Sequence, residues 1–99
     1  MSQNKVRIAI AGATGYVGLD LIYYLCKHSK AHISYLCAQK NLNSNIQKFD
    51  KRIKKKLPKI SKLSKVNWNN VDLLFLSLPN GEAQKILKDL YKFKHLKFI

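Results

Sequence analysis

Three glycines at intervals of three residues, Gly12, Gly15 and Gly18, lie within the stretch IAIAGATGYVGLDLIYYL (residues 8–25). Apolar and β-branched residues precede them and a helical pattern follows, so the glycines stand between a predicted strand and a predicted helix. In this context Gly12 permits a tight turn, Gly15 lets the backbone approach a pyrophosphate, and Gly18 lets the helix pack closely on the sheet. The free N–H groups and the positive dipole end of the helix favour an anion at the same place. The motif therefore predicts dinucleotide binding.

The residues that follow the motif narrow the choice of nucleotide. A mononucleotide P-loop needs Lys followed by Ser or Thr after its last glycine, whereas Leu19 and Asp20 follow Gly18. An NAD-specific site usually has an acidic residue about 20 positions further on, where the second strand ends. Here that strand ends YLCAQK, and no acidic residue lies between Asp20 and Asp50. Lys40 could pair with a 2′-phosphate, so NADP is favoured over NAD, although Lys40 could equally be one of many surface lysines.

The pattern of apolar residues predicts the elements that position this motif. Near-continuous apolar runs at 5–11 and 71–78 are typical of strands buried on both faces of a parallel sheet. Shorter strands are expected at 32–37 and 66–68, and another begins in the last five residues, HLKFI. The polar, basic segment 39–65 is expected to be a long loop with a short helix near 46–55.

Two helices are expected, each with one buried face. The first starts at Tyr16, and the second follows Pro79, with Asn80 as its N-cap and Glu82 in its first turn. The predicted buried faces are Val17, Leu21, Ile22 and Leu25 in the first helix, and Ala83, Ile86, Leu87, Leu90 and Tyr91 in the second. This alternation of strands and helices predicts a Rossmann-like, doubly wound α/β parallel sheet in one domain, residues 1–99. A parallel strand that stops at Ile99 suggests the front part of something longer.

The strong positive charge raises the possibility of nucleic-acid binding. The formal net charge is +14, but all of the basic residues except Arg7 and Arg52 are lysines. Specific readers of nucleic acid depend on arginine for bidentate contacts. The densest run, KRIKKKLPKISKLSK at 51–65, could bind polyanions without specificity, but a solvated, lysine-coated loop is the favoured interpretation. No specific nucleic-acid partner is expected.

Cysteine and histidine spacings predict no metal site and no catalytic group. Cys26 and Cys37 form no CxxC pair, and the three histidines have no ligand spacing. Both cysteines are expected to be small, partly buried side chains without a disulfide. The chain has no run of roughly 18 apolar residues and no signal-peptide pattern, so a cytoplasmic protein with no membrane partner is expected.

Two segments resemble a known family. The stretch IAIAGATGYVGLDLIYYL, together with VDLLFLSLPNGEA at 71–83, is similar to the N-terminal cofactor domain of the N-acetyl-gamma-glutamyl-phosphate reductases, within the semialdehyde dehydrogenase superfamily. The resemblance covers nearly the whole chain. Those reductases tend to have a Leu-Pro-His-Gly-like sequence where this chain has Leu78-Pro79-Asn80-Gly81, and Asn80 can still cap a helix.

The resemblance implies an oxidoreductase of arginine biosynthesis that uses NADPH to reduce an acyl phosphate to an aldehyde through a cysteine thioester. It implies a homo-oligomer whose catalytic Cys and His lie beyond these residues, so no catalytic residue carries over and the chain alone is expected to be inactive. The residues that carry over bind cofactor. They are Gly12, Ala13, Thr14, Gly15, Tyr16 and Val17 at the pyrophosphate, Gln39 and Lys40 near the adenine ribose, and Leu78, Pro79 and Asn80 on the nicotinamide side.

Two other interpretations remain open, the aspartate-semialdehyde type and a non-catalytic module, whereas the short-chain dehydrogenases are set aside. Aspartate-semialdehyde dehydrogenases share the glycine motif, but usually have a Ser-Ala-Gly-Gly-like second motif. Short-chain dehydrogenases have a catalytic Tyr-x-x-x-Lys, which Tyr23 and Lys27 imitate in the first helix, where helical spacing alone accounts for it. A non-catalytic NADP-binding module would also contain the cofactor motif without catalytic residues.

Overall fold

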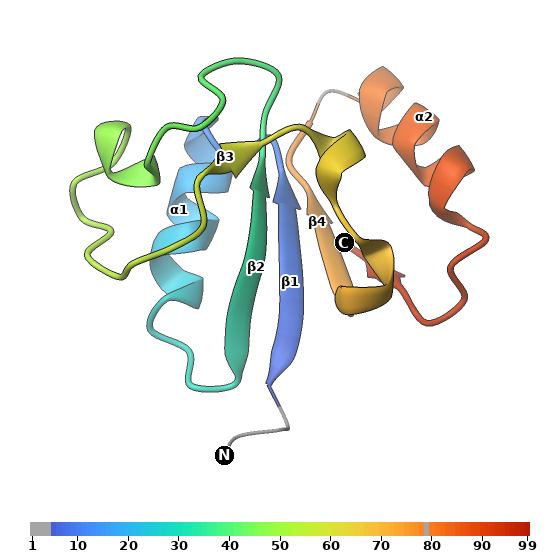
Figure 1. Cartoon of the computed structure of the whole chain (residues 1–99), viewed down its shortest axis with the longest axis horizontal. Coiled ribbons are helices and arrows are strands. Elements are labelled where there is room, and N and C mark those ends of the chain that lie inside the picture. The colour runs from blue at the N-terminus through green and yellow to red at the C-terminus, as the bar shows by residue number, and fades with distance from the viewer. Residues whose placement is uncertain (1–4, 79) are drawn as a thin grey trace.

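The computed structural model describes residues 5–78 and 80–99. Five parallel strands form one sheet in the order β3-β2-β1-β4-β5, with β1 in the centre (Figure 1). The strands and α-helices are β1 (Val6–Ala11), α1 (Tyr16–Leu25), β2 (Ala31–Cys37), β3 (Ile60–Ser61), β4 (Leu73–Leu76), α2 (Asn80–Leu90) and β5 (Lys97–Phe98). The chain adds β2 and β3 on one side of β1, then crosses to add β4 and β5 on the other side. This is the predicted doubly wound α/β arrangement.

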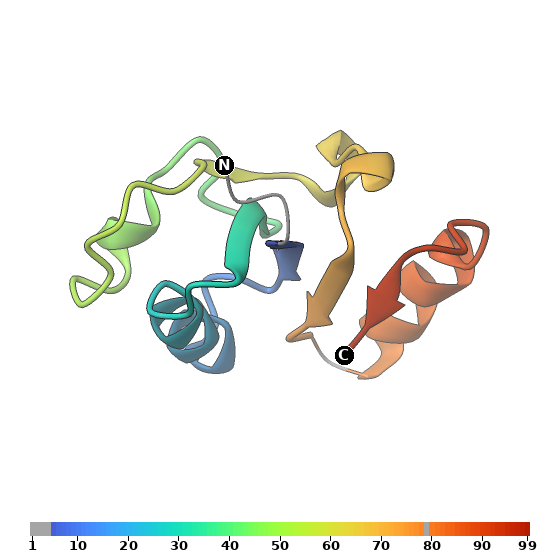
Figure 2. The ribbon, with the colours of Figure 1, turned by 90° about the horizontal axis from the view of Figure 1, so that it is seen from below.

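Side chains of β1 alternate between two hydrophobic cores, one on each face of the sheet. Ile8 and Ile10 pack with Ile22 of α1, whereas Ala9 and Ala11 pack with Leu90 of α2 and with Trp68. The two helices therefore cover opposite faces, because neighbouring residues of a strand point to opposite sides. Figure 2 shows α1 on one side of the strands and the short 3-10 helix η3 (Trp68–Asn70) on the other.

The segment between β2 and β4 differs from the prediction. It contains the short strand β3, which the sequence did not predict, and η1 (Ile46–Lys48) is a single 3-10 turn rather than a helix over 46–55. The predicted strand at 66–68 is wrong, because Trp68 begins η3 and Val66 follows η2 (Leu63–Lys65). Ile46, Ile53 and Ile60 are at most 1% exposed and fill the core beside α1, so this basic segment is anchored by buried isoleucines.

The predicted buried faces of the helices are each wrong at one position. Val17 is 70% exposed because the buried face of α1 runs through Gly18 and Ile22 instead. Tyr91 is 61% exposed because α2 ends at Leu90, and its ring meets the edge of Phe98. Pro79 lies outside the described residues, as does the predicted capping interaction of the Asn80 side chain. Among the described residues, no helix is long and apolar enough to cross a membrane.

An ion pair joins the starts of β1 and β4, at the opposite end of the sheet from the glycines. The Asp72 carboxylate accepts the Arg7 backbone N–H at 2.8 Å and two guanidinium N–H groups at 3.1 and 2.9 Å. These bonds to Arg7, opposed by partial burial, lower the pKa of Asp72 to about 2. The charged form of Asp72 is therefore the form that the fold prefers.

We expect the Arg7–Asp72 pair to make the free energy of unfolding decrease at acidic pH. A carboxyl whose pKa is lowered by folding stabilises the fold above its unfolded pKa of about 4, and this contribution is lost as the pH falls toward about 2. Because both side chains are about two-fifths exposed, Asp72→Asn should cost no more than about 1 kcal/mol at neutral pH. Urea denaturation of both proteins at several pH values measures this. A difference that is unchanged at pH 2 would contradict the expectation.

Candidate functional site

The glycine turn lies against the end of β4, across the point where the order of the strands reverses. Gly12 has a φ of +79°, and a Cβ there would stand 2.1 Å from the Ser77 carbonyl oxygen. A Cβ on Gly18 would stand 2.3 Å from the Gly12 carbonyl oxygen. Both glycines are therefore required by backbone contacts within the fold. The tight turn predicted at Gly12 is confirmed, whereas Gly18 lets the helix pack closely on the turn at Gly12 and Ala13 rather than on the sheet.

Gly15 differs from its two neighbours in the motif. Its φ is −77°, which any residue adopts, and a Cβ there would meet only the Gly12 carbonyl oxygen, at an ordinary 3.6 Å. Nothing that the fold places around Gly15 therefore requires a glycine. The space that its missing side chain leaves is open to a ligand.

Several backbone N–H groups beside Gly15 are available to that ligand. The N–H groups of Gly12 and Ala13 both donate to the Cys37 carbonyl at 3.0 Å, and that of Gly15 donates to the Gly12 carbonyl at 3.2 Å. In contrast, those of Thr14, Tyr16, Val17 and Gly18 have no backbone acceptor among the described residues. The first turn of α1 also carries no acidic residue. Unsatisfied N–H groups and the positive end of the helix dipole together suit an anion.

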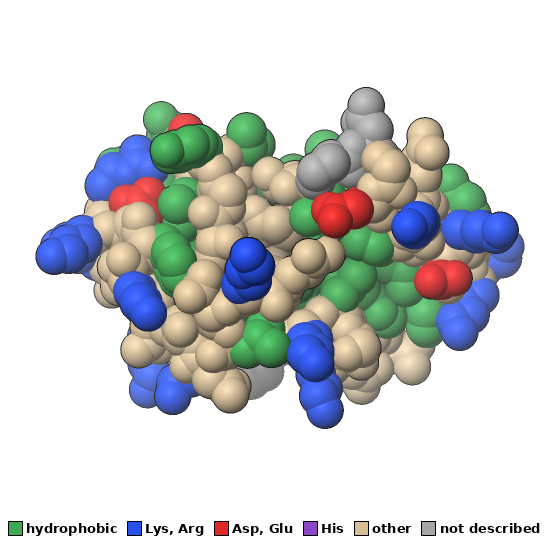
Figure 3. Space-filling view, turned by 90° about the horizontal axis from the view of Figure 1, so that it is seen from above, with side chains coloured by type: hydrophobic (Ala, Val, Ile, Leu, Met, Phe, Trp, Pro, Cys, Tyr) green, Lys and Arg blue, Asp and Glu red, His purple; other side chains and the backbone are tan. Residues whose placement is uncertain are grey.

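A cleft of about 640 Å³ opens at the carboxyl ends of the strands, within the size range of ligand sites. It brings together five of the predicted cofactor residues, Gly12, Thr14, Gln39, Lys40 and Leu78. Figure 3 looks onto this end of the molecule, where basic side chains and a few acidic ones lie around a surface of hydrophobic side chains, other side chains and backbone. Ligands of open α/β sheets bind at such a position, outside the carboxyl ends of the strands where their order reverses.

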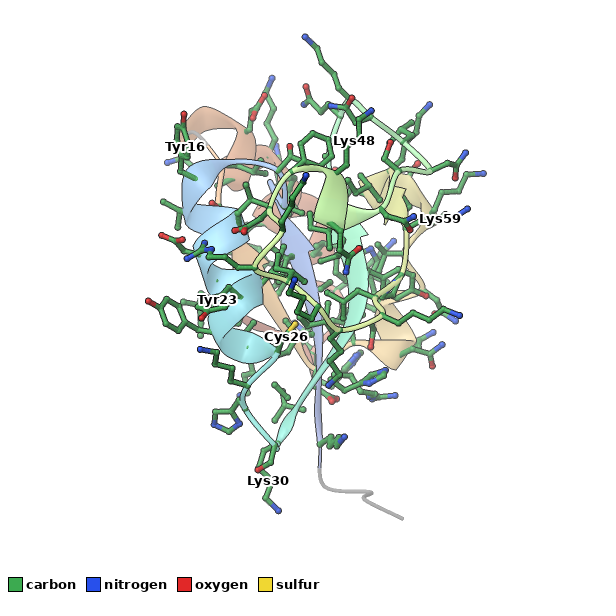
Figure 4. The ribbon with its side chains drawn as sticks, turned by 90° about the vertical axis from the view of Figure 1, so that its left-hand side faces the viewer. Tyr16, Tyr23, Cys26, Lys30, Lys48 and Lys59 are labelled. Atoms are coloured by element: carbon green, nitrogen blue, oxygen red, sulfur yellow. The ribbon has the colours of Figure 1, made fainter. Side chains whose placement is uncertain are left out.

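Among the described residues, Gly15 and the predicted residues Ala13, Tyr16 and Val17 do not line this cleft, although they adjoin Gly12 and Thr14 in the turn. Ala13 is fully buried beneath the turn, whereas Tyr16 and Val17 are 93% and 70% exposed. Tyr16 is the first residue of α1, and Figure 4 shows its side chain at that end of the helix. Tyr16 and Val17 can therefore bind a ligand through their backbone N–H groups rather than through their side chains. Asn80 is the first residue of α2, and Pro79 lies outside the described residues.

Sequence reasoning missed the part of the cleft that β3 and α2 supply. Lys62, Leu63 and Ser64 follow β3, and Glu82 and Ile86 come from α2. The Gln39 side chain donates a long 3.4 Å hydrogen bond to the Glu82 carboxylate, so β2 and α2 meet at the cleft. The apolar Ile60 shortly after Pro58 was the one indication of β3 in the sequence. A strand of two residues is too short to show the alternation of apolar and polar residues by which strands are recognised.

Neither cysteine is suited to nucleophilic chemistry. Burial raises the pKa of the Cys37 thiol to about 11 and also raises that of Cys26, with Lys55 opposing the shift at Cys26. Both thiols are therefore protonated at neutral pH, and a protonated thiol is a weak nucleophile. Cys26 lies where α1 faces the loop (Figure 4), away from the glycine turn. Within the described residues, no three His, Cys, Asp or Glu side chains form a metal site.

A second hollow of about 470 Å³ lies along β2, beside the end of α1. Its cationic lining includes Lys55, Lys56 and Arg7, but the Arg7 guanidinium is already bound to Asp72. It contains none of the glycine turn, and no helix begins at it. The carboxyl-end cleft is therefore the better candidate for a nucleotide.

Comparison with known proteins agrees with this geometry. Residues 7–98 match the family described as semialdehyde dehydrogenase, NAD binding domain. The chain belongs to this family. It is 37% identical over 89 residues to N-acetyl-gamma-glutamyl-phosphate reductase of Ehrlichia ruminantium, covering 88% of this chain and 26% of that protein. The Rhodospirillum rubrum reductase is 32% identical over 93 residues, covering 93% of this chain and 26% of the relative. The chain thus spans about a quarter of the length of these relatives.

Solved structures share the fold. Aspartate semialdehyde dehydrogenase of Candida albicans, in a structure with NADP, superposes with a TM-score of 0.69 at 23% identity, over 87% of this chain and 26% of that one. The Vibrio cholerae aspartate semialdehyde dehydrogenase II superposes with a TM-score of 0.70 at 17% identity, over 95% of this chain and 30% of that one. The fold is therefore that of an NAD(P)-binding domain of this family.

The different surroundings of Gly12 and Gly15 predict different effects on stability. Gly12→Ala should lower the free energy of unfolding by about 2 kcal/mol or more, because its Cβ meets the Ser77 carbonyl and the positive φ disfavours alanine. Gly15→Ala should change it by no more than about 0.5 kcal/mol, because its Cβ is accommodated. Thermal denaturation of the two variants tests this. Equal losses would show that Gly15 is also required by the fold.

Proposed function

We propose that the carboxyl-end cleft binds NADP(H), with the pyrophosphate at the glycine turn. The observation that supports this most directly is the open space at Gly15 beside unbonded N–H groups. A glycine that the fold does not need is explained by a ligand that needs its backbone. The C. albicans relative in a complex with NADP is consistent with this choice of cofactor.

The positions around the cleft suggest how the cofactor would lie. Gln39 and Lys40 follow β2 and would contact the adenine ribose, while Leu78, with Pro79 and Asn80 beyond it, would lie toward the nicotinamide. The pyrophosphate would bind between them, over Gly12 and Thr14 of the cleft and the open space at the adjoining Gly15, with N–H groups from Tyr16 and Val17. The nicotinamide supplies a hydride when bound. The role of this chain is to hold the cofactor and direct its reactive ring toward a substrate.

We further propose that these residues are the cofactor domain of a cytoplasmic, homo-oligomeric N-acetyl-gamma-glutamyl-phosphate reductase of arginine biosynthesis. The identity to the E. ruminantium and R. rubrum reductases supports this choice over the aspartate-semialdehyde type. The Leu78-Pro79-Asn80-Gly81 sequence supports it as well. In this proposal, residues 1–99 form one domain, and the acyl-phosphate substrate and the catalytic residues belong to the remainder of the enzyme.

Calorimetric titration tests the cofactor proposal. The 99-residue chain should bind NADP(H) more tightly than NAD(H), and Gly15→Val should abolish binding of both while the protein stays folded. The reason is that a branched side chain at Gly15 would occupy the space left for the pyrophosphate. Equal affinity for both cofactors, or preference for NAD(H), would contradict the choice of NADP.

A matched control separates cofactor binding from binding of polyanions. Neutralising the exposed lysines Lys54, Lys55 and Lys56 removes three charges outside the cleft and should leave cofactor affinity almost unchanged. In a gel-shift assay, any DNA binding by the unchanged chain should be weak and should fall steeply with salt. Tight, salt-resistant DNA binding would overturn our interpretation of the charge.

The chain alone should not turn over N-acetyl-gamma-glutamyl phosphate. Covalent catalysis needs a thiolate with a base in reach, and burial keeps Cys26 and Cys37 protonated. A coupled assay that follows NADPH absorbance measures this. Turnover that disappears in Cys26→Ser or Cys37→Ser would refute the assignment of catalysis to the remainder of the enzyme.

A further inference from the structure

The short strand β3 brings a second lysine to the cleft that Lys40 lines. β3 pairs in parallel with the end of β2, with Leu36 opposite Ile60 and Cys37 opposite Ser61. The Ala38 N–H continues this pairing by donating to the Ser61 carbonyl at 3.2 Å. Lys62 follows Ser61 directly, just as Ala38, Gln39 and Lys40 follow Cys37. Lys40 and Lys62 therefore leave adjacent strand ends and both line the cleft.

The ion pairs among the described residues do not involve these two lysines. The Arg52 guanidinium forms ion pairs with the carboxylates of Asp20 and Asp50, each at 2.7 Å, and the Arg7 guanidinium pairs with Asp72. The remaining carboxylate in the cleft, that of Glu82, accepts from Gln39. Within the described residues, neither Lys40 nor Lys62 has a carboxylate within 4.0 Å. Lys40 and Lys62 give the lining of the cleft two positive charges against the single carboxylate of Glu82, and this excess of positive charge favours a bound anion.

Lys40 and Lys62 also differ from the other lysines in where they lie. The chain has many exposed lysines, so lack of an ionic partner alone means little. Among the described lysines, these two line the carboxyl-end cleft, and Lys65, three residues after Lys62, does not. Ser64 adds a hydroxyl to the same wall. The position of Lys62 depends on the pairing of β3 with β2, which fixes its backbone.

We propose that Lys62 is a second determinant of cofactor choice, which binds the 2′-phosphate of NADP together with Lys40, with Ser64 as a further donor. This inference rests on the proposed binding of NADP(H) in the cleft. A phosphate between two ammonium groups is stabilised by charge-assisted contacts from both sides. NAD has a hydroxyl at that position, so removal of Lys62 affects NADP and spares NAD.

The test measures selectivity in the full 99-residue chain. Affinities for NADP and NAD, and for adenosine 2′,5′-bisphosphate and 5′-AMP, are compared by calorimetry in the unchanged chain and in Lys62→Ala. We expect Lys62→Ala to weaken the two 2′-phosphorylated ligands roughly three- to ten-fold and to leave the other two unchanged, the scale of one exposed charged contact. Lys40→Ala should have a similar effect. Added salt should narrow the preference of the unchanged chain more than that of Lys62→Ala.

Two further variants separate a specific contact from a general effect of charge. Lys65→Ala removes the same charge from η2, outside the cleft, and should leave all four affinities unchanged. Lys62→Arg keeps the charge and should retain the preference for NADP. Equal weakening of NADP and NAD by Lys62→Ala, or no weakening of either, would overturn the role of Lys62 while NADP binding by the unchanged chain still stood. Failure of the unchanged chain to bind either dinucleotide would instead refute the proposed function.

Discussion

The backbone at Gly12 contacts the ends of both strands that flank β1. Its N–H donates to the Cys37 carbonyl at the end of β2, and its α-carbon faces the Ser77 carbonyl just beyond β4. Its own carbonyl faces Gly18, which brings α1 close to the turn. The central strand, both neighbouring strands and the first helix thus converge on one residue that cannot carry a side chain. The position of the cleft follows from this contact.

The two faces of the sheet support the cleft in different ways. On one face α1 and the isoleucines of the 39–65 segment form a core around Ile10, and this core holds a long basic loop close to β2. On the other face the small residues Ala9 and Ala11 pack with Trp68 and Leu90. Burial of the loop's isoleucines on one face allows β3 to pair with β2, and packing of α2 on the other face brings Glu82 into the lining of the cleft.

Three of the few acidic residues of the chain form ion pairs with its two arginines. Arg7 and Arg52, the two arginines, hold Asp72, Asp20 and Asp50, and these pairs lie outside the cleft. The ion pairs of the described residues involve no lysine, and Lys40 and Lys62 differ from the other exposed lysines in lining the cleft. Of the many positive charges of the chain, only those whose side chains line the cleft act together on a small anion bound there.

The sequence by itself determined the parallel α/β fold, the turn at Gly12 and the helix that follows it. These features depend on local backbone geometry and on the spacing of apolar residues, and both can be recognised from residues that are close together in the sequence. It did not reveal β3, the exposure of Val17 and Tyr91, or the presence of Lys62 and Glu82 in the same cleft as Lys40. Those features depend on which segments pair across the sheet, and Lys40 and Lys62 line the same cleft because β3 pairs with the end of β2. A contact between residues far apart in the chain is set by packing, and only the tertiary structure decided it.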